Sequence, residues 1–130
     1  MSRFATRYPK RGEIWFIDPD FVYPDPDNTI GEEITKGRPV VVISSDVFEE
    51  QQVRVVVPFT SWQDKFEAMD FHYRVDADAV NRLDNDSSLN VLQVRCISTL
   101  RFEGYIGRLA PDQLSEVLAL LGFAVDAEFS

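Results

Sequence analysis

The chain has 130 residues, of which 45% are hydrophobic and 27% are charged, a composition that excludes intrinsic disorder and predicts one folded domain over residues 1–130. Asp and Glu number 22 against 13 Lys and Arg, so the net charge of -9 excludes nucleic-acid binding by bulk electrostatic attraction. The apolar runs are too short for a membrane helix, and the basic N-terminus lacks the apolar core of a signal peptide. We therefore expect a soluble cytoplasmic protein that makes no membrane contact.

The first half of the chain predicts three strands and one long loop. The run EIWFI at 13–17 favours a short strand, and the β-branched runs at 39–44 and 53–59 are typical of strands covered on both faces. Residues 18–37 hold three prolines among Asp and Asn, a density that breaks helices and strands. Residues 45–52 form a polar connection. A loop as long as 18–37 is commonly functional or disordered in a compact domain.

The second half predicts three further strands, at 71–75, 91–97 and 105–109, with a turn-rich link at 81–88. Alternation within 71–75 places its aromatic residues on one face of the sheet and its histidine and arginine on the other.

A single clear helix is predicted at the C-terminus, because Pro111 suits the first helical position and Gly122 suits its end. One apolar stripe follows the helical spacing, formed by Leu114, Val117, Leu118 and Leu121. Six short strands and one helix predict a mainly β, β-rich α+β fold. We expect a small antiparallel barrel or half-open sheet capped by the helix.

The sequence carries no signature of a nucleotide-dependent or metal-dependent enzyme. It has no phosphate-binding glycine loop, no dinucleotide turn and no set of Cys and His ligands, so we expect no cofactor and no metal. The single histidine, His72, excludes a nuclease with two catalytic histidines, and on a polar strand face we expect it to be solvated or half-buried. The single cysteine, Cys96, is expected to be a small buried hydrophobe.

A more specific pattern joins Arg38 and Thr60. Arg38 stands where the long loop enters the strand 39–44, and Thr60 stands where the strand 53–59 ends. Antiparallel pairing of these two strands would bring the two side chains together, and a guanidinium beside a hydroxyl is suited to gripping a phosphate. The alternative is structural: Arg38 would pair with a loop acid, and Thr60 would cap a turn.

Several motifs, taken in order, resemble the MazF/PemK (Kid) family of bacterial toxin ribonucleases. They are RGEIWFID at 11–18, GEEITKGRPVVVIS at 31–44, VVPFTS at 56–61, VLQVRCISTL at 91–100 and IGRLAPDQL at 106–114. The resemblance implies an SH3-like β-barrel with a C-terminal helix, the PemK/CcdB-like fold, acting as a homodimer. It also implies a metal-independent endoribonuclease that cuts single-stranded mRNA at a short sequence through a 2′,3′-cyclic phosphate. The implied partner is a cognate antitoxin, and DNA would be reached only through the antitoxin complex.

The resemblance also implies roles for individual residues. Arg38 would stabilise the pentacoordinate phosphate and relay a proton, and Thr60 would hold a non-bridging oxygen. Glu33 matches the family's loop glutamate, which would act as a base or orient Arg38. Substrate binding would fall to Ser61, Gln93 and Arg95, and to Phe59 and Trp62, whose rings flank Thr60 and would either stack a base or pack the barrel rim.

Two departures from the family pattern keep another function open. Many relatives have Asp-Gln where this chain has Leu92 and Gln93, and the loop at 18–37 is unusually acidic. An acidic loop over an RNA groove would weaken RNA entry at low salt. The alternative is a non-catalytic CcdB-like binding protein that poisons DNA gyrase, or a toxin relative that has lost cleavage.

Overall fold

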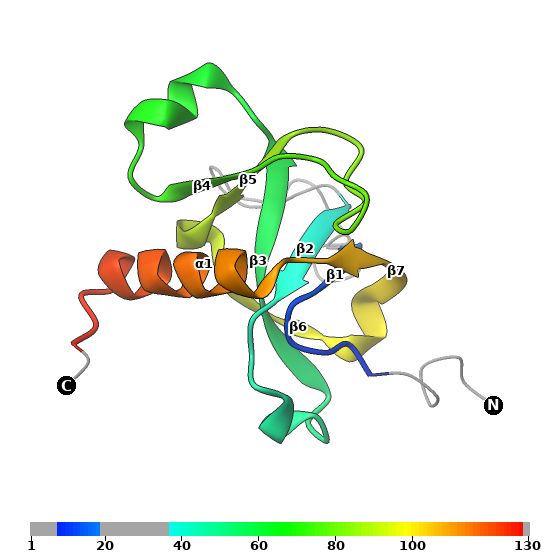
Figure 1. The fold of residues 1–130 in the computed structure, drawn as a ribbon. Helices are drawn as coiled ribbons and strands as arrows, with labels where there is room; N and C mark the ends of the chain where they lie inside the picture. The colour runs from blue at the N-terminus through cyan, green and yellow to red at the C-terminus, as the bar shows by residue number, and fades with distance from the viewer. Residues whose placement is uncertain (1–7, 19–36, 129–130) are drawn as a thin grey trace, which may run out of the picture.

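The computed structural model describes residues 8–18 and 37–128, which form one antiparallel sheet and one α-helix (Figure 1). The strands are β1 (Glu13–Ile17), β2 (Arg38–Val42), β3 (Val53–Ser61), β4 (His72–Val75), β5 (Ser87–Asn90), β6 (Arg95–Ser98) and β7 (Phe102–Arg108). The helix α1 spans Pro111–Ala124, and short 3₁₀ turns lie at Asp46–Phe48, Asp64–Ala68, Val91–Gln93 and Thr99–Arg101. None of the helices in the described ranges is long and apolar enough to cross a membrane.

The sheet runs in the order β4-β5-β3-β2-β1-β7, and β6 pairs with the first half of β3. The long strand β3 therefore pairs with β2, β5 and β6, which makes it the centre of the fold. The predicted mainly β architecture with a C-terminal helix is confirmed, although the sheet does not close into a full barrel.

Both faces of the central strands are covered, as their continuous β-branched runs predict. Val41 and Val57 point into a core that packs against α1, which crosses in front of the sheet (Figure 1). Val40, Val42 and Val56 point to the opposite face, into a second core with Trp15 and Phe102. This alternation explains why the runs contain no polar position in the middle of the sheet.

The structure differs from the predicted link at 81–88 and the predicted strand at 91–97. Ser87–Asn90 is a strand, because β3 and β4 pair with its two edges. The segment after it begins with the turn Val91–Gln93, because the side-chain oxygen of Asn90 accepts the Leu92 N–H at 3.0 Å and caps a turn there. The strand β6 therefore starts only at Arg95.

The helix runs past Gly122, so the prediction that this glycine ends it is wrong. Gly122 is buried inside α1, and the left-handed residue is Asp126, with φ of 54°. The Asp126 N–H bonds to the Phe123 carbonyl at 3.1 Å, and the Ala127 N–H bonds to the Gly122 carbonyl at 2.8 Å. These two bonds form a Schellman cap around a non-glycine residue.

Cys96 is exposed, which corrects the expectation of a buried hydrophobe. It pairs across the sheet with Val55, which is also exposed, while its neighbour Ile97 points into the second core. Because strand residues alternate between faces, burial of Ile97 forces Cys96 outward.

Candidate functional site

One face of the sheet carries a row of polar residues across four strands. Val40 of β2 pairs with Pro58 of β3, and extending this register by two residues sets Arg38 opposite Thr60. Thr60 pairs with Ser88 of β5, and Ser88 in turn pairs with Arg74 of β4. Directly paired residues lie on the same face, so the predicted approach of Arg38 to Thr60 has its structural basis in this register.

A cavity of about 310 Å³ opens on this face. It is lined by Arg38, Pro58, Thr60, Lys65, Phe66, Met69, Phe71, His72, Asn90 and Gln93. The charged side chains in this lining are cations, and no Asp or Glu among the described residues contributes to it. The acidic chain therefore has a locally cationic cavity, which suits an anionic group.

A second cavity of about 250 Å³ also includes Arg38 and Thr60 in its lining. The residues that it adds are Gly37, Pro39, Phe59, Ser61, Leu83, Asp84, Asn85 and Ser87. Arg38 and Thr60 thus contribute to two hollows, one with aromatic and cationic side chains and one that is mainly polar. This arrangement fits an extended ligand whose anionic group lies at the two residues.

The Arg38 side chain is half-buried, and its Nε is buried without a hydrogen-bond partner among the described residues. Burial lowers the pKa of the guanidinium, although arginine remains a cation at neutral pH. A buried donor without an acceptor is costly unless a ligand supplies one. The alternative of a salt bridge to a loop acid concerns residues 19–36, which lie outside the described ranges.

Two further predicted site residues lie in the cavities with Arg38 and Thr60. Gln93 lines the first, presented by the capped turn that follows β5, and Ser61 lines the second at the end of β3. Leu92, which replaces the family aspartate, is 57% exposed and contributes to neither lining. Glu33 lies outside the described residues.

The aromatic residues on either side of Thr60 have different environments. Phe59 is 2% exposed and belongs to the core against α1, although it also borders the second cavity. Of the two roles expected for it, its burial favours packing over base stacking, since alternation turns residues 59 and 60 to opposite faces. Trp62 is partly exposed, with Phe66 edge-on at 5.8 Å and the Arg74 guanidinium 4.8 Å from its ring.

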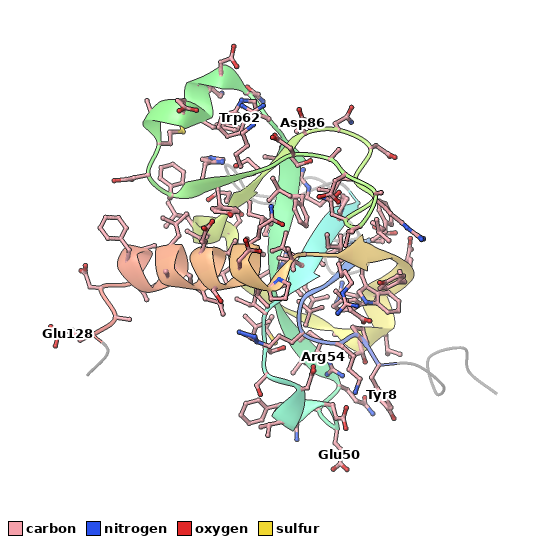
Figure 2. The ribbon with its side chains drawn as sticks, in the orientation of Figure 1. Tyr8, Glu50, Arg54, Trp62, Asp86 and Glu128 are labelled. Carbon is pink, nitrogen blue, oxygen red and sulfur yellow. The ribbon has the colours of Figure 1, made fainter. Side chains whose placement is uncertain are left out.

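Trp62 lies at one end of the molecule together with Asp86, whereas Arg54 lies at the other (Figure 2). The Trp62 N–H donates to the Asp86 carbonyl at 2.9 Å, which ties the end of β3 to the segment before β5. Arg95 is half-buried on β6 opposite Val56 and lines neither of the two cavities. Its predicted contact with substrate therefore lies outside the hollows around Arg38.

Three polar or charged residues of the first cavity were not assigned to the site from the sequence: Lys65, His72 and Asn90. Lys65 belongs to the connection between β3 and β4, a segment anchored by the buried ring of Phe66. The one available signal was the place of His72 on the polar face of its strand, and the expected half-buried state is found.

The donor set suits an anion better than a metal. Within residues 8–18 and 37–128, no group of three or more His, Cys, Asp or Glu side chains could hold a metal ion. The described polar groups that line the first cavity beside Arg38 are one hydroxyl, two amides, a lysine and an imidazole, which bind phosphate oxygens by hydrogen bonds and charge.

Comparison with known proteins places this geometry in a family. The fold is similar to MazF from Deinococcus radiodurans, with a TM-score of 0.70 and 18% identity over 92% of this chain and 98% of that chain. It is also similar to toxin MazF-mt6 from Mycobacterium tuberculosis, with a TM-score of 0.68 and 21% identity over 90% and 99% of the two chains. No curated protein sequence matches significantly.

A third similar structure is a mycobacterial endoribonuclease in complex with its cognate antitoxin, with a TM-score of 0.67 and 13% identity over 94% and 99% of the two chains. The family model of PemK-like, MazF-like toxins matches residues 10–124, which include every strand and the helix described above. The chain therefore belongs to the PemK-like, MazF-like toxin family of type II toxin–antitoxin systems.

Proposed function

We propose that this toxin is a metal-independent endoribonuclease that cuts single-stranded mRNA. The observation that carries the proposal is Arg38. Its Nε is buried and has no hydrogen-bond partner among the described residues, and Arg38 lies with Thr60 in a cavity to which those residues contribute the cation Lys65 and no acid. A phosphodiester supplies the missing acceptor and the missing negative charge. The endoribonuclease named among the similar structures supports the same reaction class.

The proposed reaction uses the RNA itself as nucleophile. The ribose 2′-oxygen bonds to the adjacent phosphorus while the bond from phosphorus to O5′ breaks, leaving a 2′,3′-cyclic phosphate and a 5′-hydroxyl. Arg38 stabilises the charge on the pentacoordinate phosphate, and Thr60 donates a hydrogen bond to a non-bridging oxygen. Glu33 has one of two roles in this proposal, as the base or as a carboxylate that orients Arg38.

Single-stranded RNA is the substrate class that the two cavities favour. A strand that passes Arg38 and Thr60 places one nucleotide in the cationic cavity with Gln93 and the next in the polar cavity with Ser61. Trp62 offers an aromatic surface at that end of the sheet. Because the chain carries a net charge of -9, affinity depends on these local contacts rather than on bulk attraction.

The proposed partners are a second copy of the chain and a cognate antitoxin. Similar structures include an endoribonuclease in complex with its cognate antitoxin and MazE-MazF complexes of Deinococcus radiodurans. Apolar side chains that line neither cavity are exposed at Val55, Leu100 and Phe123, which supports association through apolar contacts. In this proposal, Arg95 also contacts RNA beyond the cavities, and DNA is reached only through the antitoxin.

The test is incubation of purified protein with a long single-stranded RNA in EDTA. We expect discrete fragments that end in cyclic phosphate from the wild type and none from Arg38→Ala. Arg108→Ala, which removes an exposed arginine of β7, is the matched control and should cut normally. Intact RNA together with inhibition of DNA gyrase would contradict the proposal and indicate a non-catalytic toxin. Cleavage that occurs without EDTA and is lost when EDTA is added would contradict metal independence.

A further inference from the structure

Among the described residues that line the cationic cavity, His72 is the one titratable side chain that can exchange a proton near neutral pH. We propose that His72 is the general base of the cleavage reaction, taking the proton of the attacking 2′-hydroxyl on Nε2. This inference rests on the proposed function and adds a catalytic residue to it. Glu33 then keeps the second of its two roles, the orientation of Arg38.

Two contacts fix the orientation of the His72 ring. Its Nδ1 lies 2.7 Å from the hydroxyl oxygen of Ser88, which is completely buried, and one ring face stacks on Phe66 at 3.8 Å and 9°. Nε2 has no hydrogen bond to a described residue and is not buried. When Nδ1–H donates to Ser88, the lone pair of Nε2 is available to a ligand in the cavity.

The sheet register places this ring close to Thr60. Ser88 is the direct cross-strand neighbour of Thr60, and the His72 ring reaches back from β4 to the Ser88 hydroxyl on β5. Neighbouring strands are about 4.8 Å apart, so the Ser88 backbone lies one strand spacing from Thr60, and the imidazole is one hydrogen bond from the Ser88 side chain and lines the same cavity as Thr60. That separation lets one ribose and its phosphate touch His72 and Thr60 together, as a general base requires.

The proton transfers of this reaction balance without a metal or cofactor. Nε2 takes the proton from O2′ as the bond from O2′ to phosphorus forms, and O5′ takes a proton from water as its bond to phosphorus breaks. His72 then returns its proton to the hydroxide that the water left. The phosphate gains one negative charge as the pentacoordinate species forms and loses it as O5′ departs, and Arg38 and Thr60 stabilise that added charge.

The electrostatics of the cavity support the base role. Burial, with a further contribution from the positive charge of Lys65, lowers the pKa of His72 below its ordinary value of 6.5. The neutral form able to accept a proton therefore predominates at pH 7. Among the described residues, the charged side chains that line the cavity with the ring are Arg38 on β2 and Lys65 on the connection before β4. Both are cations, so neither opposes this direction.

The experiment is the pH dependence of kcat/KM for RNA cleavage in EDTA, measured for the wild type and for His72→Gln. In the wild type we expect the rate to rise with pH through the lowered pKa of His72 and then to level off. His72→Gln should lose roughly 10²–10⁴-fold and should lose this acid limb. A variant that cleaves with the wild-type rate and limb overturns the inference while leaving the proposed nuclease intact.

A second variant keeps the test valid if His72→Gln fails to fold. Lys65→Gln removes a positive charge that lowers the pKa of His72, so the pKa of His72 should rise. The acid limb of the kcat/KM profile should then move to higher pH, whether or not the maximal kcat/KM also changes. An unmoved limb assigns the titration to another group and overturns the base role. Absence of cleavage by the wild type itself would instead overturn the proposed function, and the base role with it.

Discussion

Replacing Arg38 by methionine is expected to abolish cleavage and, at the same time, to stabilise the fold. Methionine keeps the apolar stem but removes a guanidinium whose Nε is buried without a partner among the described residues. A buried polar group left unsatisfied costs about 1–3 kcal/mol. Because the side chain is only half-buried, we expect a gain of about 1 kcal/mol in the free energy of unfolding, which raises Tm by roughly 3–6 °C.

Arg54→Met is the matched comparison, and it should lower the free energy of unfolding rather than raise it. Arg54 is 4% exposed, and its guanidinium donates to four backbone carbonyls at 2.7–3.0 Å, those of Pro9, Glu49, Gln51 and Val53. Losing these charge-assisted bonds should cost about 3 kcal/mol or more, and Tm should fall by roughly 10 °C.

Urea denaturation followed by circular dichroism measures both arginine variants, and RNA cleavage in EDTA measures activity beside it. If Arg38→Met destabilises the fold as much as Arg54→Met does, the Arg38 guanidinium has a structural role rather than a ligand-binding one. The proposed anion site would then be refuted.

Three further predictions address the site and the fold. Thr60→Ala should lower kcat roughly 10²–10³-fold, while Thr60→Ser keeps most of it; equal rates for the two would remove Thr60 from the phosphate site. Gly107→Ala should destabilise by about 1–3 kcal/mol, because a Cβ there would lie 2.4 Å from the Asn81 carbonyl oxygen; unchanged thermal unfolding would disprove this close approach. Asp126→Gly should stabilise by about 0.5–1 kcal/mol, because glycine adopts the left-handed cap without strain; a lower urea midpoint would argue against the cap.

The strands that carry the fold were predictable because their residue types leave little choice. The β-branched runs of β2 and β3 favour extended backbone and bury on both faces. The strand β5, with the sequence SSLN, has no such preference, and its extended state comes from pairing with β3 and β4. Local sequence does not reveal a strand that its neighbours impose.

The site residues also divide into those that local sequence predicts and those whose position depends on a neighbouring strand. The approach of Arg38 to Thr60 follows from the register of two adjacent strands, so the sequence was enough to predict it. The place of His72 depends on its bond to Ser88 in β5, the strand that was missed. Burial of Phe59 was accessible from alternation alone, since it must face away from Thr60.

The most direct measurement of the central claim is the Arg38 side-chain Nε–H signal in an NMR titration with a single-stranded RNA carrying 2′-O-methyl groups, which block cleavage. We expect this signal to shift on binding, because a phosphate oxygen takes the acceptor position that no described residue fills. The Arg54 Nε–H, already bonded to the Pro9 carbonyl, should stay in place. Saturable RNA binding that leaves the Arg38 signal unmoved would contradict the account.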